Sequence, residues 1–338
     1  MGVDISGILE KTPMRLEDLS GTRIAVDAYN TIYQFVSAIR QPDGRPLSDS
    51  DGRPTSPLIG LLHRNARLLS GGIRPFYVFD GIPIDLKAAT LEKRKQIKIQ
   101  AEEKYREAVE RKDMEKAYSY AMQTTRLTSE MVSESMRMLE MLGIPYMTAP
   151  ADGEAQASQM AARGDVWAVA SQDYDSLLYG TPRLVRNLSL SGRRKVPGRR
   201  EFRDVEIEMV ELEPNLKRLG ISREQLVDIA VLVGTDFNEG VRGVGAKKGI
   251  AAIKKDGRIE STQYAGQIDA AHLEKVREVF LRPSFVSEYT LEWRRPDDDA
   301  LLGFLCDEHE FSRDNVLDTL SVLRKSPVSE QQSLDRWG

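Results

Sequence analysis

The chain has 338 residues, a formal net charge of −4 and 41% hydrophobic residues, which fits a globular protein with a sizeable buried core. No apolar run approaches the roughly 18 residues that span a bilayer, so we expect no membrane partner. A single cysteine excludes an internal disulfide, and three scattered histidines argue against a zinc site. The first residues resemble no export leader, so we expect a cytoplasmic protein.

The predicted elements of the first half alternate between strands and helices. Four short β-rich apolar runs are predicted strands: 22–26, 75–79, 144–147 and 166–170. Helical stretches, such as 58–69 and 129–142, separate them. Because such alternation is typical of α/β domains, we predict a mostly parallel central sheet flanked by helices.

Later segments differ from this pattern. Residues 85–127 are highly charged and hold too few apolar residues for a core-facing side, so we predict helices that project from the body, or a segment that is ordered only with a partner. Residues 222–311 are predicted to be mainly helical. Residues 326–338 are polar and are predicted to form a flexible tail.

Acidic residues follow all four predicted strands. In chain order they are Asp27, Asp80, Asp152, Glu154, Asp173 and Asp175. In open α/β sheets, ligands bind outside the carboxyl ends of the strands, so we expect these six carboxylates at one edge. Asp236, which follows an apolar helical run, would complete the cluster from outside the sheet.

So many like charges would repel one another strongly unless cations lie among them. Oxygen ligands without His or Cys favour Mg²⁺, with Mn²⁺ as a substitute. Two such ions about 4 Å apart would activate a water and stabilise the leaving oxygen in phosphodiester hydrolysis. As an alternative, Asp27, Asp80 or Asp152 could cap a helix, and Asp173 and Asp175 could form a turn. The coincidence across four strand ends favours the metal site.

Basic residues gather in three runs, at 87–98, 193–203 and 242–258. Separate acidic and basic clusters suit a protein that holds metal and phosphate together, although a solvated surface is the alternative for each run. In the third run, glycines at 240–245 precede a predicted helix. Backbone N–H groups there would bind phosphate beside Lys247 and Lys248.

The acidic motifs resemble those of the flap endonucleases, which are XPG-type structure-specific 5′ nucleases. The resemblance extends along the whole chain and implies a PIN-like 5′ nuclease fold with a two-metal site formed by all seven acids. Asp152 stands where the family usually has Glu, so it either binds a metal directly or acts through a water. The matching motifs are Val26-Asp27-Ala28, Val78-Phe79-Asp80-Gly81, Ala149-Pro150-Ala151-Asp152-Gly153-Glu154-Ala155, Ser171-Gln172-Asp173-Tyr174-Asp175 and Gly234-Thr235-Asp236-Phe237.

The resemblance also implies how the chain is organised. The implied nuclease regions are residues 1–98 and 128–258, and the second ends in a helix–turn–helix module that often recruits K⁺ in the family. A helical arch, residues 85–127, would cover the active site. Residues 259–325 would form a C-terminal helical region. Lys87 and Arg94 match the family's catalytic cations, which stabilise charge at the scissile phosphate. The DNA-binding residues implied are Tyr33, Arg40, Arg64, Gly243, Gly245, Lys247 and Lys248. Without the resemblance, Tyr33 would be interpreted as a core residue.

The tail, 326–338, contains a pattern similar to the motif that docks into the replication sliding clamp, proliferating cell nuclear antigen. Its anchors are Gln331, Leu334 and Trp337. Gly338 stands where the family motif has a second aromatic residue, and a frayed tail with a chance tryptophan is the alternative. The absence of a basic extension after the motif favours an archaeal-type protein.

The predicted function is a monomeric, Mg²⁺-dependent 5′ flap endonuclease with 5′-3′ exonuclease activity, acting in Okazaki fragment maturation and DNA repair. One alternative is a relative that prefers Holliday junctions or repair bubbles. Another is a non-catalytic junction-binding or clamp-adaptor protein. The clamp-like tail and short arch favour flaps, and packed negative charge beside DNA would not help a protein that only binds it.

Overall fold

A seven-stranded sheet forms the centre of the computed structural model, which describes residues 2–41, 43–111, 113–188, 192–195 and 202–326. The strand order is β1-β9-β6-β5-β2-β3-β4. The five strands from β6 to β4 run parallel, and β9 is antiparallel to both β6 and β1. This confirms the mostly parallel sheet. The bounds are β1 (Thr12–Met14), β2 (Arg23–Asp27), β3 (Arg74–Phe79), β4 (Tyr146–Thr148), β5 (Ala168–Ala170), β6 (Arg183–Arg186) and β9 (Ile207–Glu211).

All four predicted strands are present, at the centre and one edge of the sheet. β2 pairs with β3 on one side and β5 on the other, so that Ala25 faces both Phe76 and Val169. Its apolar residues are buried on both faces, as expected for a strand between helical layers. A separate two-stranded ribbon, β7 (Gly192–Lys195) and β8 (Phe202–Val205), contains the described backbone of the basic run 193–203; the side chains of this run lie outside the described part.

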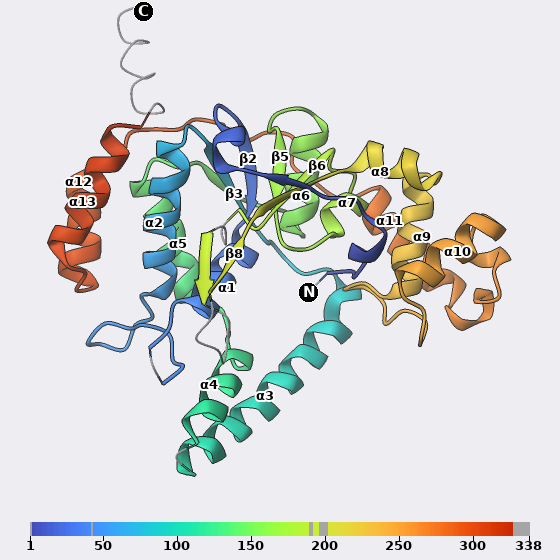
Figure 1. Ribbon diagram of the computed structural model, residues 1–338, viewed down its shortest axis with the longest axis horizontal. Coiled ribbons are helices and arrows are strands. Elements are labelled where there is room, and N and C mark those ends of the chain that lie inside the picture. The colour runs from blue at the N-terminus through green and yellow to red at the C-terminus, as the bar shows by residue number, and fades with distance from the viewer. Residues whose placement is uncertain (1, 42, 112, 189–191, 196–201, 327–338) are drawn as a thin grey trace, which may run out of the picture.

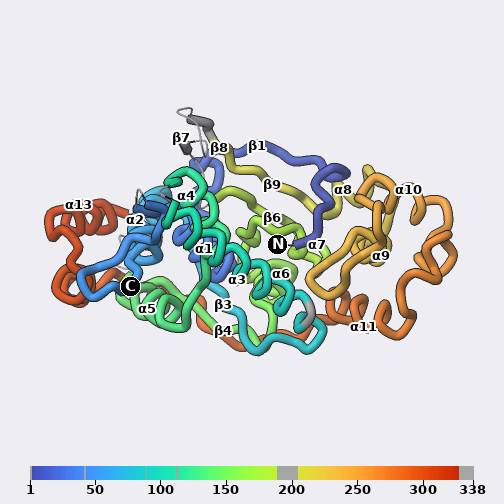
Figure 2. Tube along the Cα trace, turned by 90° about the horizontal axis from the view of Figure 1, so that it is seen from below, coloured from blue at the N-terminus to red at the C-terminus, as the bar shows by residue number. Residues whose placement is uncertain are grey.

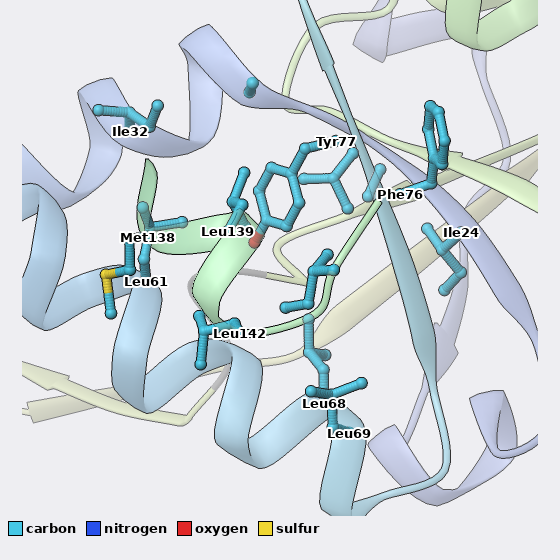
Figure 3. Close-up of a cluster of buried hydrophobic side chains, with 14 of the residues drawn as sticks. Ile24, Ile32, Leu61, Leu68, Leu69, Phe76, Tyr77, Met138, Leu139 and Leu142 are labelled. Atoms are coloured by element: carbon cyan, nitrogen blue, oxygen red, sulfur yellow. The ribbon is translucent and has the colours of Figure 1, made fainter. Parts of the chain in front are cut away.

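The first hydrophobic core lies between the sheet and three helices, α1 (Ala28–Ala38), α2 (Ser56–Ser70) and α5 (Ser129–Met141). Figure 3 shows Leu61, Met138 and Leu139 gathered around the ring of Tyr77. The Tyr77 hydroxyl donates a hydrogen bond to the side-chain oxygen of Asn65, 3.1 Å away, which satisfies a polar group in this core. Helix α6 (Gly153–Ala162) packs against β2, β3 and β5.

The contact between α1 and α2 depends on a glycine. A Cβ at Gly60 would lie 2.2 Å from the ring of Phe35. Gly60→Ala is therefore expected to lower the free energy of unfolding by about 1–3 kcal/mol, despite the better helix propensity of alanine. Urea unfolding measures this change. Gly303→Ala is the matched control, because its Cβ meets open space; equal stability losses in the two variants would contradict the packing argument.

A second core lies at the other end of the molecule, under α8 (Leu212–Leu219), α9 (Arg223–Val233), α10 (Ala246–Asp256) and α11 (Ala270–Leu281). Both views place these helices away from α2, α5 and α13 (Arg313–Arg324) (Figures 1 and 2). Arg277 links α11 to α9. Its guanidinium donates two hydrogen bonds, of 2.7 and 2.8 Å, to the buried carboxylate of Asp228 in α9. It also contacts Glu260.

Arg277→Met is expected to destabilise the protein by about 3 kcal/mol or more, because Asp228 would keep a buried charge without its partner. Hydrogen exchange in α9 and α11 and urea unfolding measure the effect. The double variant Asp228→Asn/Arg277→Met should recover part of the loss, since it removes both charges. A double variant as unstable as the sum of the single ones would contradict this coupling.

The charged segment 85–127 is mainly helical and projects from the body, as predicted, and we refer to it as the arch. After the short 3₁₀ helix η3 (Asp85–Lys87), α3 (Ala88–Glu110) and α4 (Met114–Gln123) pair closely and project from the body (Figure 1). Small residues allow this close approach: Ala101, Ala108, Ala117 and Ala121 are buried. The two helices therefore pack through small side chains rather than through a large apolar face.

The segment 222–311 is mainly helical, as predicted, but it includes a long irregular stretch after α11. Residues 282–297 contain no helix and cross the body in an irregular path, held by backbone bonds such as Arg294 N–H to the carbonyl of Gly143. Residues 298–308 are helical again, as α12 (Asp298–Leu302) and the π-helix η6 (Gly303–Glu308). No helix within the described ranges is long and apolar enough to cross a membrane.

Candidate active site

The structure brings the seven predicted acids together where the parallel strands end. Asp27 and Asp80 stand at the carboxyl ends of β2 and β3, and Asp173 follows β5. Asp152 and Glu154 lie at the start of α6 and Asp175 at the start of α7 (Asp175–Leu178), while Asp236 lies in the turn after α9. Their charges act on one another: Asp27 interacts with Asp80, Asp152 and Asp173, and Asp236 acts on Asp80 and Asp175.

Two of these acids also cap helices. The Asp27 carboxylate accepts a hydrogen bond from Asn30 N–H, 3.0 Å away, at the start of α1, and Asp152 accepts one from Glu154 N–H, also 3.0 Å, at the start of α6. Helix capping was the alternative explanation for both residues. The structure shows that they cap helices and also belong to the acidic cluster. Asp80 caps no helix; it accepts a hydrogen bond from Gly153 N–H, 2.7 Å away.

Close backbone packing joins the end of β3 to the start of α6. Gly81 N–H donates to the carbonyl of Ala151, 2.6 Å away, and a Cβ on Gly81 would lie 2.0 Å from the carbonyl oxygen of Ala149. No other residue type fits there without a shift of the backbone. The sequence Asp80-Gly81 therefore places one acid of the cluster directly against the loop that carries two others.

Burial and mutual repulsion make the cluster hard to ionise. Asp27, Glu154 and Asp175 are buried. Burial first, and the charge of Asp80 second, raise the pKa of Asp27, and burial together with Asp27 raises the pKa of Glu154. Burial and Asp152 raise the pKa of Asp80 to about 6; burial, and then Asp173, raise the pKa of Asp175 to about 7. Positive charge placed among these groups would stabilise their ionised forms.

Two cations from the base of the arch face the cluster. The Lys87 ammonium forms an ion pair with Asp152, and the Arg94 guanidinium contacts Asp236 at 2.5 Å. Burial alone would lower the pKa of Lys87, but the carboxylates of Asp152, Asp80 and Asp236 raise it above its usual value. Both sequence-predicted catalytic cations are therefore at the acidic edge and charged.

The donor set suits hard divalent cations, because it offers several carboxylate oxygens and no sulfur or imidazole. Within the described ranges, no three Asp, Glu, His or Cys side chains are already placed as metal ligands. Their oxygens instead accept hydrogen bonds from their own chain, such as that from Ser176 Oγ to Glu154, 2.8 Å.

The three residues predicted to contact DNA near the arch differ in how exposed they are and in what they contact. Tyr33 on α1 is 38% exposed, and the ammonium of Lys98 on α3 lies 5.8 Å from the centre of its ring. Arg40 is half-buried: its guanidinium donates to the carbonyls of Gly44 and Ala121 and to Thr125, fixing the base of α4. Arg64 is partly buried on α2, near Tyr77.

The glycine-rich turn before α10 is open to solvent. Gly243 adopts a left-handed conformation (φ +78°), and a Cβ on Gly243 or Gly245 would meet no atom within 4 Å. Lys247 is exposed, and Lys248 Nζ donates to the carbonyl of Gly243, 2.8 Å away. A phosphate could therefore approach this turn closely. The predicted clamp anchors, Gln331, Leu334 and Trp337, lie outside the described residues.

Several residues that support the acids were not predicted. Val3 N–H donates to Asp175 at 2.8 Å, Asn30 donates to Asp173 at 3.3 Å, and the Tyr179 hydroxyl donates to Asp152 at 3.2 Å. Asn30 could have been predicted from the sequence, because it lies three residues after Asp27 and therefore on the same side of the predicted helix. The long-range contact of the N-terminal segment with Asp175 left no local pattern.

Comparison with known proteins identifies the family to which this fold and site belong. Residues 1–101 match the XPG N-terminal domain and residues 143–236 the XPG I-region. Over its full length the chain is 49% identical to flap endonuclease 1 of Archaeoglobus fulgidus, covering 100% of that protein, and 47% identical to that of Pyrococcus furiosus, covering 99%.

Solved structures agree. Flap endonuclease-1 from Methanococcus jannaschii matches with a TM-score of 0.75 and 37% identity, over 98% of this chain and 100% of that one. The catalytic core of Rad2 in complex with DNA substrate matches with a TM-score of 0.70 and 25% identity, over 93% and 96%. Together, fold and acidic edge define an XPG-type nuclease. Within that class the chain belongs to the flap endonuclease family, which confirms the resemblance seen in the sequence.

Proposed function

We propose that this protein is a structure-specific 5′ flap endonuclease that hydrolyses one phosphodiester at the junction of a branched DNA, with 5′-3′ exonuclease activity on the same site. The observation that carries the proposal is the gathering of seven carboxylates at one sheet edge, faced by Lys87 and Arg94. Its roles would be Okazaki fragment maturation and DNA repair.

We propose that Asp27, Asp80, Glu154, Asp173 and Asp175 hold two Mg²⁺ ions, with Asp152 and Asp236 contributing directly or through water; Mn²⁺ would substitute. The raised pKa values of Asp27, Asp80, Glu154 and Asp175 support this, because bound cations would relieve the cost of their ionisation. Bound divalent ions would supply an activated water and stabilise the leaving oxygen.

The chain's own cations would act on the phosphate. Lys87 and Arg94 enter from the arch, so that a phosphodiester lying on the acidic edge would meet them on the side away from the sheet. Lys87 would provide a compact charge and Arg94 a planar set of donors for the non-bridging oxygens. Tyr33 would stack against a base next to the junction.

The turn at Gly243 and Gly245, with Lys247 and Lys248, would hold the duplex backbone, with K⁺ bound at this module. Because phosphate contacts read no bases, specificity would follow the shape of the DNA. Arg40 and Arg64 would contact the duplex near the branch; for Arg40 this requires that it exchange a carbonyl partner for phosphate. Gln331, Leu334 and Trp337 would bind proliferating cell nuclear antigen, and the protein would act as a monomer in the cytoplasm.

Cleavage of a labelled 5′-flap duplex tests the proposal. With Mg²⁺ we expect release of the flap by a cut at the junction, and with EDTA we expect none. Matched substrates without a flap, with a 3′ flap, with a bubble and with a Holliday junction distinguish the flap enzyme from its junction- and bubble-specific relatives. Binding without metal-dependent cleavage would overturn the proposal in favour of a non-catalytic adaptor.

A further inference from the structure

An arginine on a neighbouring strand holds the segment 171–175, which carries two of the seven acids. This segment follows β5, and β6, which runs parallel to β5, ends at Arg186. Because the carboxyl ends of parallel strands meet at one edge, Arg186 lies beside the segment. Its Nε donates a hydrogen bond to the carbonyl of Gln172, 3.2 Å away, and a terminal nitrogen of the same guanidinium donates to the hydroxyl of Tyr174.

The ring of Tyr174 is the centre of these contacts. The guanidinium carbon of Arg186 lies 4.2 Å from the ring centre, and the ammonium of Lys11 lies 5.7 Å from it. The side chain is buried, and its hydroxyl donates a hydrogen bond to Ser6 Oγ, 3.1 Å away. Contacts between a cation and an aromatic ring are stronger where water is excluded. Tyr174 is therefore fixed both by β6 and by the N-terminal segment of the chain.

A carboxylate outside the acidic cluster holds both cations in place. Glu208 on β9 is the register neighbour of Arg186, and its carboxylate lies 3.1 Å from the guanidinium and 3.5 Å from the ammonium of Lys11. Lys11 immediately precedes β1, and β6, β9 and β1 lie side by side in the sheet (Figure 2). The strand order therefore assembles the group around Tyr174.

This arrangement lets Arg186 act on the acids through the backbone. Its hydrogen bonds go to the segment 171–175 and to Glu208, and among the described residues none goes to the acidic cluster. Tyr174 lies between Asp173 and Asp175 in the chain, so the position of its ring constrains the turn that presents both acids. Removing a positive charge would by itself favour a bound metal cation, whereas losing the anchor would disfavour it. The two effects have opposite signs.

We propose that Arg186 is a positioning residue of the metal site, because it holds Tyr174 and thereby sets Asp173 and Asp175 for divalent cations. The proposal rests on the proposed binding of metal by these acids. Groups that orient metal ligands contribute about ten-fold or more to metal affinity. Arg186 would therefore determine the metal concentration that the enzyme needs, and it would have little effect on the cleavage rate at saturating metal.

Binding of Mn²⁺ to the full-length protein without DNA, followed by the electron paramagnetic resonance of the free ion, tests this role. In Arg186→Gln we expect a Kd for Mn²⁺ about ten-fold higher than in the wild type. Arg186→Lys keeps the charge but has no planar set of donors, so its Kd should be intermediate.

Flap cleavage by the same variants should show the same effect on metal dependence. In Arg186→Gln the Mg²⁺ concentration that gives half the maximal rate should rise about ten-fold. At saturating Mg²⁺ the single-turnover rate should stay within about three-fold of the wild type, because the chemical step would keep all its groups. A residue that acted only on stability would lower the melting temperature and leave the Kd for Mn²⁺ unchanged.

Arg183→Gln is the matched control. Arg183 begins the same strand, so it lies at the opposite end from the segment 171–175. Its guanidinium also lies over an aromatic ring, that of Trp167 at 5.0 Å, and pairs with a carboxylate, that of Glu211. The substitution thus removes the same charge and the same kind of contacts. Its Kd for Mn²⁺ should stay within about two-fold of the wild type.

Two results would overturn the proposal and leave the nuclease function intact. One is an Arg186→Gln protein that binds Mn²⁺ at least as tightly as the wild type; if this variant does not fold, a wild-type Kd in Arg186→Lys decides in the same way. The other is equal weakening in Arg186→Gln and Arg183→Gln. A wild-type protein that binds no Mn²⁺ and does not cleave would instead refute the proposed metal site, and the positioning role with it.

Discussion

Asp175→Asn is expected to reduce flap cleavage by roughly 10³-fold or more, while binding of the flap substrate in EDTA stays within about two-fold of the wild type. Asp175 is buried at the centre of the cluster, beside Asp173 and facing Asp152 and Asp236, so its charge is central to any metal held there. The amide keeps the size of the side chain and can still accept the hydrogen bond from Val3. Single-turnover cleavage and fluorescence-anisotropy binding measure the two effects.

The same substitution should stabilise the protein at alkaline pH in EDTA. Burial and Asp173 raise the folded pKa of Asp175 to about 7, above the value of about 4 for an unfolded chain. A raised folded pKa means that the group favours the folded state at pH below about 4, and that this contribution is lost as pH rises to about 7. At pH 8 the variant should therefore melt at a higher temperature than the wild type. Near-normal cleavage, or a lower melting temperature at pH 8, would contradict the assignment of Asp175.

Lys87→Ala and Arg94→Ala are each expected to slow cleavage by roughly 10²-fold to 10³-fold, with a smaller effect on substrate affinity. The reason is that each cation would stabilise charge that develops at the phosphate during reaction and not in the bound substrate. Both groups already lie at the acidic edge, through Asp152 and Asp236. Single-turnover rates at saturating enzyme isolate this step from binding.

Lys93→Ala is the matched control for these two variants. Lys93 precedes Arg94 on α3, is exposed and pairs with Glu239 at the surface, so its loss removes the same charge from the same helix without reaching the cluster. It should change the cleavage rate less than about three-fold. If Lys93→Ala slowed cleavage as much as Arg94→Ala, the effect would come from the general charge of the arch, and the specific role of Arg94 would be wrong.

The central strands were predictable because their sequence is dictated by burial on both faces. The run at 75–79 is apolar throughout and becomes β3, and Ile24, Ala25 and Val26 of the run at 22–26 are buried in β2. β6 (Arg183–Arg186) and β9 (Ile207–Glu211) escaped prediction because they carry charges and depend on pairing with neighbouring strands. Residues 282–297 form no helix within a segment predicted to be mainly helical, because the bonds that hold them come from distant loops such as that at Gly143.

The acidic edge was predictable because the carboxyl ends of parallel strands must meet, whatever lies between them in the chain. What the sequence could not supply was the local partner of each acid. Arg40 illustrates this: the family resemblance implied a DNA contact, but the carbonyl of Ala121, 81 residues away, accepts a hydrogen bond from its guanidinium. Asp80 likewise depends on Gly153 N–H, which only the folded chain brings to it.

Anomalous diffraction from crystals soaked in Mn²⁺ tests the central claim most directly. We expect two peaks within bonding distance of the carboxylates of Asp27, Asp80, Glu154, Asp173 and Asp175, and we expect the peaks to weaken or vanish in Asp175→Asn. Strong peaks elsewhere on the molecule, with none among these five side chains, would contradict the proposed metal site and the hydrolysis that depends on it.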